Sequence, residues 1–391
     1  MNKLFLGLGS LAIAAIAASA AQAQDTVKIG LIMSYSGQFA DTATQIDNGV
    51  KLYMKQKGDT VAGKKIELIR KDTGGIAPDV ATRLAQELVT RDKVDILAGF
   101  ALSPNAIAVS KVSASGKKFM VIMNAATTVI ITMSPYSVRT SVTLPSIGMT
   151  AGSWAHKSGI RKVYTMVSDF APGKDAEAAF HEAFKKAGGE IVGSVRMAVA
   201  NPDFSAYVQR AKDLNPESIF IFVPGGAQPA AIGKAFAERG IDAKKVKIIG
   251  TGEVVDEASL KGMGDAGLGI ISVWHYDYNL GSKTNQEFVK AFNAEFKRNP
   301  DFFAVGGYDG MHAIYEALKK TGGKTDADAL VAAAKGLKWE SPRGPMQIDA
   351  QTRDIVQTIY IRKVEKVGDG LRNVVFDKVE NVKDPGSAGK K

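Results

Sequence analysis

The stretch VDILAGFALSPNAIAVS (residues 94–110) belongs to a unit that the chain carries twice. Each copy consists of a long amphipathic helix, an apolar strand, a glycine-containing loop, a second helix and a second strand. In the first copy, the helix VATRLAQELVTRDK follows Asp79, the strand VDILAGF comes next, a helix opens at Pro104, and the strand FMVIMN ends at Asn124. Helical periodicity that alternates with short, fully apolar runs is typical of an α/β protein with parallel sheets.

The second copy begins after Asp203 with the helix FSAYVQRAKDLN and continues through the strand SIFIFVPGG to VKIIG, which ends at Gly250. Asp79 and Phe100 are 21 positions apart, and Asp203 and Gly225 are 22 positions apart. Each copy therefore places its loop at the same edge of its own sheet. Because ligands of open α/β sheets bind just outside the carboxyl ends of the strands, two facing copies predict a cleft that grips a ligand from both sides.

The N-terminus has the pattern of a cleavable secretory signal. Lys3 is followed by a mostly small and apolar run, residues 4–20, and by the sequence Ala-Gln-Ala at 21–23. A basic start, a short apolar segment and an Ala-x-Ala site predict a signal peptide over residues 1–23. The chain contains no cysteine, so we expect neither disulfides nor a thiol-attached lipid anchor. The predicted location is the periplasm, as a free protein.

Charge and length narrow the class of protein further. The formal net charge is +10, and removal of Lys3 with the signal leaves 49 basic against 40 acidic residues. These charges are scattered, without an arginine-rich stripe or interleaved aromatics, so we expect no nucleic-acid partner. About 365 mature residues exceed what one core usually organises, which predicts two lobes.

Three connections between the lobes are expected. The segment PYSVRTSVTLP (135–145) predicts an extended first crossing, LGIISVWHYDY (268–278) is interpreted as a strand that leads into the second, and the third is placed near Pro342–Gly344. These positions predict one lobe from 25–141 and 280–340, a second from 142–279 and 341–382, and a disordered tail at 383–391.

The chain resembles a known family over residues 27–382. An export signal, the string VKIGLIMSYSGQFAD after it, GFALSPNAIAVS followed by VIMNAATTV, and the RTSVTLP stretch occur in this order. Together they are similar to the solute-binding proteins of branched-chain amino-acid ABC transporters, the leucine/isoleucine/valine-binding type, also called type I periplasmic binding proteins. The resemblance implies two Rossmann-like lobes with three crossovers, closure on the ligand about a hinge, and docking on the membrane permease subunits of a transporter.

The resemblance also implies a set of ligand contacts. A serine after the strand VDILAGF and an Ala-Ala-Thr turn after the next strand hold the ligand carboxylate, an aromatic residue of the first loop and another from the Asp-Phe-Ala-Pro-Gly loop wall the pocket, and an acid after the sixth strand meets an ammonium group. Related members take aromatic carboxylates or other small organic acids. The matching positions are Ser103, Ala125, Ala126, Thr127, Tyr35 or Phe39, Phe170 and Glu253.

The residues support an anion site by their own chemistry. Ser103-Pro104 has the form of an N-cap followed by proline at the first helical position, and a helix N-terminus at a sheet edge attracts anions. Ser103 serves either as the cap or as a ligand contact, and Glu253 either pairs with an ammonium group or is a solvated loop carboxylate. Trp274 and Tyr276 join the aromatic residues named above as candidates to contact an apolar ligand tail.

Enzymatic motifs have little support. GMGDAG (262–267) fits G-x-G-x-x-G but follows a helical run and precedes a strand, the reverse of a dinucleotide site. The four histidines show no metal-ligand spacing, and no G-x-S-x-G elbow occurs. We therefore expect no catalytic residue, metal or cofactor. The leading hypothesis is a monomeric solute-binding component of an ABC importer for a small amphipathic carboxylate. A ligand sensor for a signalling partner and a periplasmic enzyme of the same fold remain the alternatives.

Overall fold

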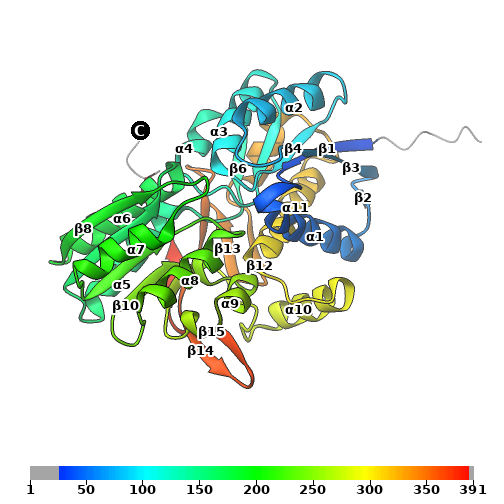
Figure 1. The fold of residues 1–391 in the computed structure, drawn as a ribbon. Coiled ribbons are helices and arrows are strands. Elements are labelled where there is room, and N and C mark those ends of the chain that lie inside the picture. The colour runs from blue at the N-terminus through cyan, green and yellow to red at the C-terminus, as the bar shows by residue number, and fades with distance from the viewer. Residues whose placement is uncertain (1–25, 387–391) are drawn as a thin grey trace, which may run out of the picture.

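The computed structural model describes residues 26–386 and forms two lobes, each built on its own sheet (Figure 1). The expected signal peptide at 1–23 and the last residues of the expected tail, 387–391, lie outside the described range. The α/β class with mostly parallel sheets is confirmed. Within residues 26–386, no helix has both the length and the apolar character needed to cross a membrane.

The first sheet has six strands, and all neighbours are parallel except β2 and β3. The three strands at its centre, Thr26–Met33, Ile96–Gly99 and Phe119–Ile122, have near-continuous apolar sequences because helices cover both faces. In order across the sheet they are β2 (Thr60–Val61), β3 (Lys64–Asp72), β1 (Thr26–Met33), β4 (Ile96–Gly99), β5 (Phe119–Ile122) and β6 (Ser137–Arg139).

Alternate strand residues of this first lobe enter two different cores. Leu31, Ala98 and Val121 pack with one set of helices, whereas Ile32 and Leu97 pack with the other. One face carries α2 (Pro78–Thr90), α3 (Ser103–Ser115) and α4 (Val129–Met133). The other face carries α1 (Ala40–Lys57), α11 (Phe302–Lys320) and α12 (Ala327–Ala334), with α10 (Lys283–Phe296) beside α1.

The second sheet has nine strands and repeats the strand order of the first. The order β8-β7-β9-β10-β11 corresponds to β3-β1-β4-β5-β6, and antiparallel strands extend it beyond β11. The strands are β7 (Lys162–Ser168), β8 (Glu190–Met197), β9 (Ser218–Phe222), β10 (Lys247–Thr251), β11 (Ile271–Trp274), β12 (Lys338–Ser341), β13 (Gly344–Ile348), β14 (Ile355–Val367) and β15 (Gly370–Val382).

Helices also cover both faces of the second sheet. The pair α5 (Leu144–Lys157) and α6 (Ala171–Lys186) packs on one side, and α7 (Phe204–Asp213), α8 (Gln228–Arg239) and α9 (Glu257–Met263) pack on the other. The chain passes between the sheets three times: between β6 and α5, between β11 and α10, and between α12 and β12. Because β12 already pairs in the second sheet, the third passage precedes the turn at 342–344, where the sequence placed it.

A buried ion pair lies where the three passages meet. Arg343 and Asp309 are each about 1% exposed, and the Nε atom of Arg343 donates to Oδ2 of Asp309 at 2.8 Å. Trp339 donates its indole N–H to the other carboxylate oxygen at 2.9 Å, and the Ser341 hydroxyl donates to Oδ2 at 2.8 Å. Both charges are therefore fully engaged inside the protein.

The remaining donors of Arg343 reach the other two passages. Its guanidinium donates to the carbonyl oxygens of Thr140 and Ser141 in the first passage. It also donates to Nδ1 of His275 in the second, at 2.8 Å. Burial and the positive charge of Arg343 hold the pKa of His275 well below its usual range, so the ring stays neutral and can accept this bond. Arg343 thus ties all three connections together.

We expect the Arg343→Met variant to lower the free energy of unfolding by about 3–5 kcal/mol, because the substitution leaves the Asp309 carboxylate buried without its cation. Urea denaturation measures this change. Lys283→Met, which alters a side chain that is 89% exposed, should change the unfolding free energy by less than about 0.5 kcal/mol. Equal stability of Arg343→Met and the unmodified protein would contradict the role assigned to the pair.

Candidate ligand-binding site

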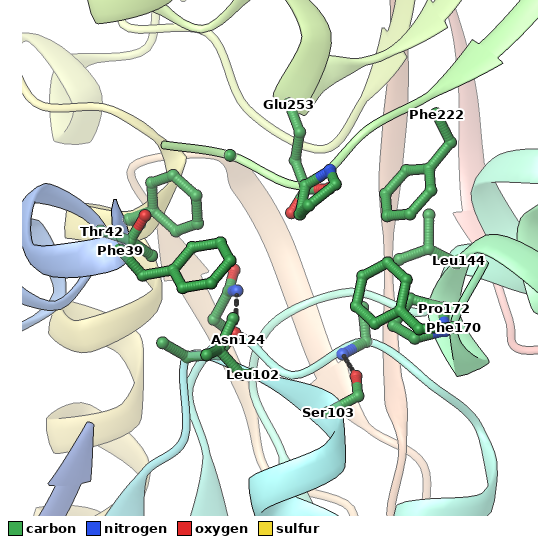
Figure 2. A pocket seen from close by; sticks show the side chains of 15 residues that line it. Phe39, Thr42, Leu102, Ser103, Asn124, Leu144, Phe170, Pro172, Phe222 and Glu253 are labelled. Atoms are coloured by element: carbon green, nitrogen blue, oxygen red, sulfur yellow. Dashed lines mark hydrogen bonds between the residues drawn. The ribbon is translucent and has the colours of Figure 1, made fainter. Parts of the chain in front are cut away.

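A cavity lies between the two lobes, at the carboxyl edges of both sheets (Figure 2). About 380 Å³ of space that no atom fills lies within it, part of which is open to solvent. The first lobe and α11 contribute Phe39, Thr42, Ala101, Leu102, Ser103, Asn124, Ala126 and Phe303, and the second lobe contributes Leu144, Phe170, Pro172, Phe222, Pro224, Gly225 and Glu253.

The lining is dominated by aromatic rings and contains a single ionisable side chain. Phe170 and Phe222 stack at 5.9 Å with an interplanar angle of 21°. Phe39 faces them from the first lobe in Figure 2, and Phe303 completes a set of four rings. Among the described lining residues no lysine, arginine or histidine occurs, and Glu253 is the one carboxyl group. The cavity therefore suits a flat apolar body.

Several helices begin at the cavity. The lining includes Leu102 and Ser103 at the start of α3, Leu144 at the start of α5, and Phe170 and Pro172 at the start of α6. Each helix N-terminus carries a partial positive charge. Three such termini at one cavity favour an anionic ligand group without any basic side chain.

The Ser103 hydroxyl organises the turn that follows β5. Leu102, not Ser103, is the N-cap of α3, so the interpretation of Ser103 as a cap is wrong. Its Oγ atom instead accepts hydrogen bonds from the backbone N–H groups of Ala126 at 3.1 Å and Thr127 at 3.3 Å. Both of these interactions use oxygen lone pairs, which leaves the hydroxyl proton for an acceptor in the cavity.

Arg139 sets the orientation of the same turn from behind. It donates to the carbonyl oxygens of Ala125 at 2.7 Å and Thr127 at 2.8 Å. Because the carbonyl and the following N–H of a trans peptide point in opposite directions, fixing the Ala125 carbonyl turns the Ala126 N–H toward Ser103. The guanidinium is fully buried, and Asp354 faces its Nε at 2.9 Å.

Five of the ten side chains predicted from the sequence line the cavity: Phe39, Ser103, Ala126, Phe170 and Glu253. Ala125 and Thr127 flank it. The Thr127 hydroxyl donates to Asp175 on α6, and the Thr128 backbone N–H donates to the same carboxylate at 3.3 Å. These contacts join the first lobe to the second. Thr127 thus contributes a contact between lobes in this structure.

The other three predicted residues lie away from the cavity. Tyr35 is held by a bond from its backbone N–H to Asp72 at 2.8 Å and is not part of the lining. Trp274 is buried, lies against the backbone of Gly252 and meets the Phe302 ring at 5.0 Å. The Tyr276 hydroxyl donates to Asn285 at 3.0 Å, across the second passage.

Sequence reasoning missed several lining residues. Phe222 ends β9 in the second repeat copy and Pro224 and Gly225 follow it, just as Ala101 and Leu102 follow the strand of the first copy, so the repeat itself contained the signal. Thr42, Asn124, Leu144, Pro172 and Phe303 were also missed, and Phe303 comes from a helix far along the chain with no local motif.

Glu253 lies on the 3-10 helix η2 (Gly252–Val255), directly after β10. Its side chain is 7% exposed, and its Oε2 atom has no hydrogen-bond partner among the described residues. Burial, together with the negative charge of Asp256, raises the pKa of Glu253 to about 8. The carboxyl group is therefore mostly protonated at neutral pH, when it can donate as well as accept a hydrogen bond.

Comparisons with known proteins agree with this architecture. The Brucella melitensis protein named Leu/Ile/Val-binding protein homolog 6 is 40% identical over 385 residues, which cover 97% of this chain and 98% of the relative. A solute-binding protein of an ABC transporter from Rhodopseudomonas palustris BisB5, solved with 3,4-dihydroxybenzoic acid, is 53% identical. Its TM-score is 0.90, and the match covers 93% of this chain and 99% of that one.

Another R. palustris ABC-transporter solute-binding protein, solved with 4-hydroxybenzoate, is 38% identical with a TM-score of 0.91, covering 94% of this chain and 100% of that one. Two lobes that enclose a small cavity define a solute-binding protein. The profile of the periplasmic binding protein family matches residues 26–370, and the chain belongs to this family. The resemblance inferred from the sequence is confirmed.

We expect the unfolding free energy to fall as the pH rises from about 4.5 to about 8, because the folded protein retains a proton on Glu253 that the unfolded chain releases. Glu253→Gln removes this contribution, which is on the order of 1.4 kcal/mol for each unit by which the pKa is raised. Urea denaturation at pH 5 and pH 8.5 measures it. The exposed Glu190→Gln serves as the control, and parallel pH profiles for Glu253→Gln and the unmodified protein would refute the assignment.

Proposed function

We propose that the protein is the periplasmic solute-binding component of an ABC importer and that it captures an aryl carboxylate. The observation that carries this proposal is the combination, in one cavity between two lobes, of four phenylalanine rings with the Ser103 hydroxyl at the start of α3. The ring of the solute occupies the space among the phenylalanines, and its carboxylate accepts a hydrogen bond from Ser103. The N-terminal pattern of residues 1–23 supports export to the periplasm.

The magnitudes are sufficient for this role. A hydrogen bond to a charged carboxylate contributes roughly 1.5–3 kcal/mol, and a helix N-terminus contributes up to about 2 kcal/mol in a partly buried setting. Micromolar affinity requires about 8 kcal/mol. Burial of an aromatic ring among four others supplies the remainder, after the loss of rigid-body freedom.

Binding without chemical change is the function that the lining favours. Its only ionisable side chain among the described residues is Glu253, and within residues 26–386 the Ser103 hydroxyl is hydrogen-bonded to backbone N–H groups and not to a base. The R. palustris relatives with 53% and 38% identity, which were solved with dihydroxybenzoate and hydroxybenzoate, support an aromatic acid over a branched-chain amino acid as the solute of this protein.

Ser103→Ala should weaken the binding of benzoate and 4-hydroxybenzoate by about 10- to 150-fold, the equivalent of roughly 1.5–3 kcal/mol, because it removes the donor to the carboxylate. Isothermal titration calorimetry measures the affinities. Ser110→Ala is the matched control, since Ser110 lies on the same helix, is buried, and donates to the Ala106 carbonyl away from the cavity. Absence of binding for every aryl carboxylate, with tight binding of leucine, would overturn the proposal.

Closure of the lobes generates a second expectation. Gly226 has a φ of +99°, and a Cβ atom at this position would lie 2.5 Å from the carbonyl oxygen of Gln38 in the opposite lobe. Gly226→Ala should therefore hold the lobes apart and weaken aryl carboxylate binding by at least about tenfold. Small-angle scattering with saturating ligand should show a larger radius of gyration for Gly226→Ala than for the unmodified protein.

Gly281→Ala is the control for this variant, because no atom lies within 4 Å of the added methyl group. Unchanged affinity and unchanged scattering for Gly226→Ala would show that the contact between Gly226 and Gln38 does not accompany binding.

A further inference from the structure

Glu253 lies across the cavity from Ser103, the proposed contact of the ligand carboxylate. Ser103 lies on the first lobe, whereas Glu253 projects from η2 of the second, and Figure 2 shows the two side chains at opposite ends of the cavity with the phenylalanine rings between them. A ligand whose carboxylate meets Ser103 therefore presents its far end to Glu253.

The segment that carries Glu253 is held in place. Gly252 packs so closely on the indole of Trp274 that a Cβ atom there would clash with the ring. Trp274 is in turn fixed against Phe302. On the other side, Asp256 caps α9 by accepting from the Ser259 backbone N–H at 2.8 Å. The carboxyl group of Glu253 is thus presented at a defined place before any ligand arrives, which reduces the entropy lost on binding.

This placement disfavours an α-amino acid as the partner of Glu253. The ammonium group of an amino acid is bonded to the carbon next to the carboxylate, so its acceptor has to lie near Ser103, at the same end of the ligand. A neutral polar group at the distal end of the ligand does not meet this objection.

We propose that Glu253 is the specificity-determining residue for a hydroxyl group on the solute ring, at a meta or para position remote from the carboxylate. This inference rests on the proposed function and extends it from aryl carboxylates in general to hydroxylated ones. The unpartnered Oε2 atom of Glu253, buried and facing the cavity, accepts the hydrogen bond that the ring hydroxyl donates. A solute without this hydroxyl leaves the carboxyl group unsatisfied inside a closed protein.

The test is a matrix of affinities, measured by calorimetry, for benzoate, 4-fluorobenzoate, 3-hydroxybenzoate and 4-hydroxybenzoate with the unmodified protein and Glu253→Met. Methionine is close to glutamate in length but lacks hydrogen-bonding oxygens. The unmodified protein should bind a hydroxybenzoate about tenfold or more tightly than benzoate and 4-fluorobenzoate. Glu253→Met should reduce this ratio to about one, with benzoate bound at least as well as before.

Ser103→Ala is the matched control, since it should weaken all four ligands by a similar factor and preserve the ratio. Glu253→Gln keeps an acceptor oxygen and should retain most of the preference. The comparison of 4-hydroxybenzoate with 4-fluorobenzoate needs no variant, and equal affinities there overturn the inference even if Glu253→Met does not fold.

Three results would overturn the inference: no preference for a ring hydroxyl in the unmodified protein, a preference that survives in Glu253→Met, or leucine binding that Glu253→Met abolishes. These outcomes are distinct from failure of the proposed function, in which no aryl carboxylate, benzoate included, binds to the unmodified protein.

Discussion

The buried pair of Arg343 and Asp309 is the constraint on which the relation between the two lobes depends. Buried ion pairs often add little net stability, because desolvation offsets the attraction. A guanidinium group also restricts geometry, because its planar arrangement of N–H donors fixes where each acceptor lies. Here one acceptor is Asp309 on α11, others belong to the first and second passages, and Arg343 itself lies just beyond the third. The two sheets diverge from this shared point, with their carboxyl edges turned toward one cavity.

A second buried arginine performs the corresponding task inside the first lobe. Arg139 holds the carbonyl oxygens of the 125–127 turn, and its charge faces Asp354, more than 200 positions later in the chain. Both arginines therefore act behind the backbone, and no basic side chain lines the described cavity, whose polar side chains are those of Thr42, Ser103, Asn124 and Glu253. A bare cation would attract any small anion, inorganic ones included. Dipoles beside four aromatic rings favour an anion that also carries an apolar body.

The repeat made the fold predictable, whereas five of the fifteen lining residues were expected from the sequence. Because each copy ends a buried strand in a loop at one sheet edge, the sequence could place Ser103 near the cavity, whereas Phe170 lies outside both copies and was expected there from the family resemblance. Local sequence could not reveal which residue of the other lobe a side chain would contact. Thr127 follows the expected strand, yet its hydroxyl meets Asp175 across the cleft. Ser103 precedes proline as a cap does, but bonds to the turn at Ala126 prevail.

Trp274 shows that local sequence also cannot decide which face of a strand a side chain occupies. Successive residues of a strand point to opposite faces of the sheet. An error of one position in the expected register therefore moves a side chain from the cavity into the core. Its ring lies against Gly252 and supports the segment that carries Glu253.

The chemistry of Glu253 is compatible with the proposal that the cavity receives an anionic solute. An ionised carboxylate there would repel the carboxylate of the solute across a desolvated space, where charges interact far more strongly than in water. Burial suppresses that ionisation, and binding of an anion suppresses it further. The neutral carboxyl group then behaves as a polar contact with no net charge. Under the proposed role of Glu253, discrimination between solutes depends on the hydrogen bond that a ligand without a hydroxyl leaves unmade. A site that binds a hydroxyl group rejects such a ligand more strongly than an apolar wall rejects a ligand with one small added group.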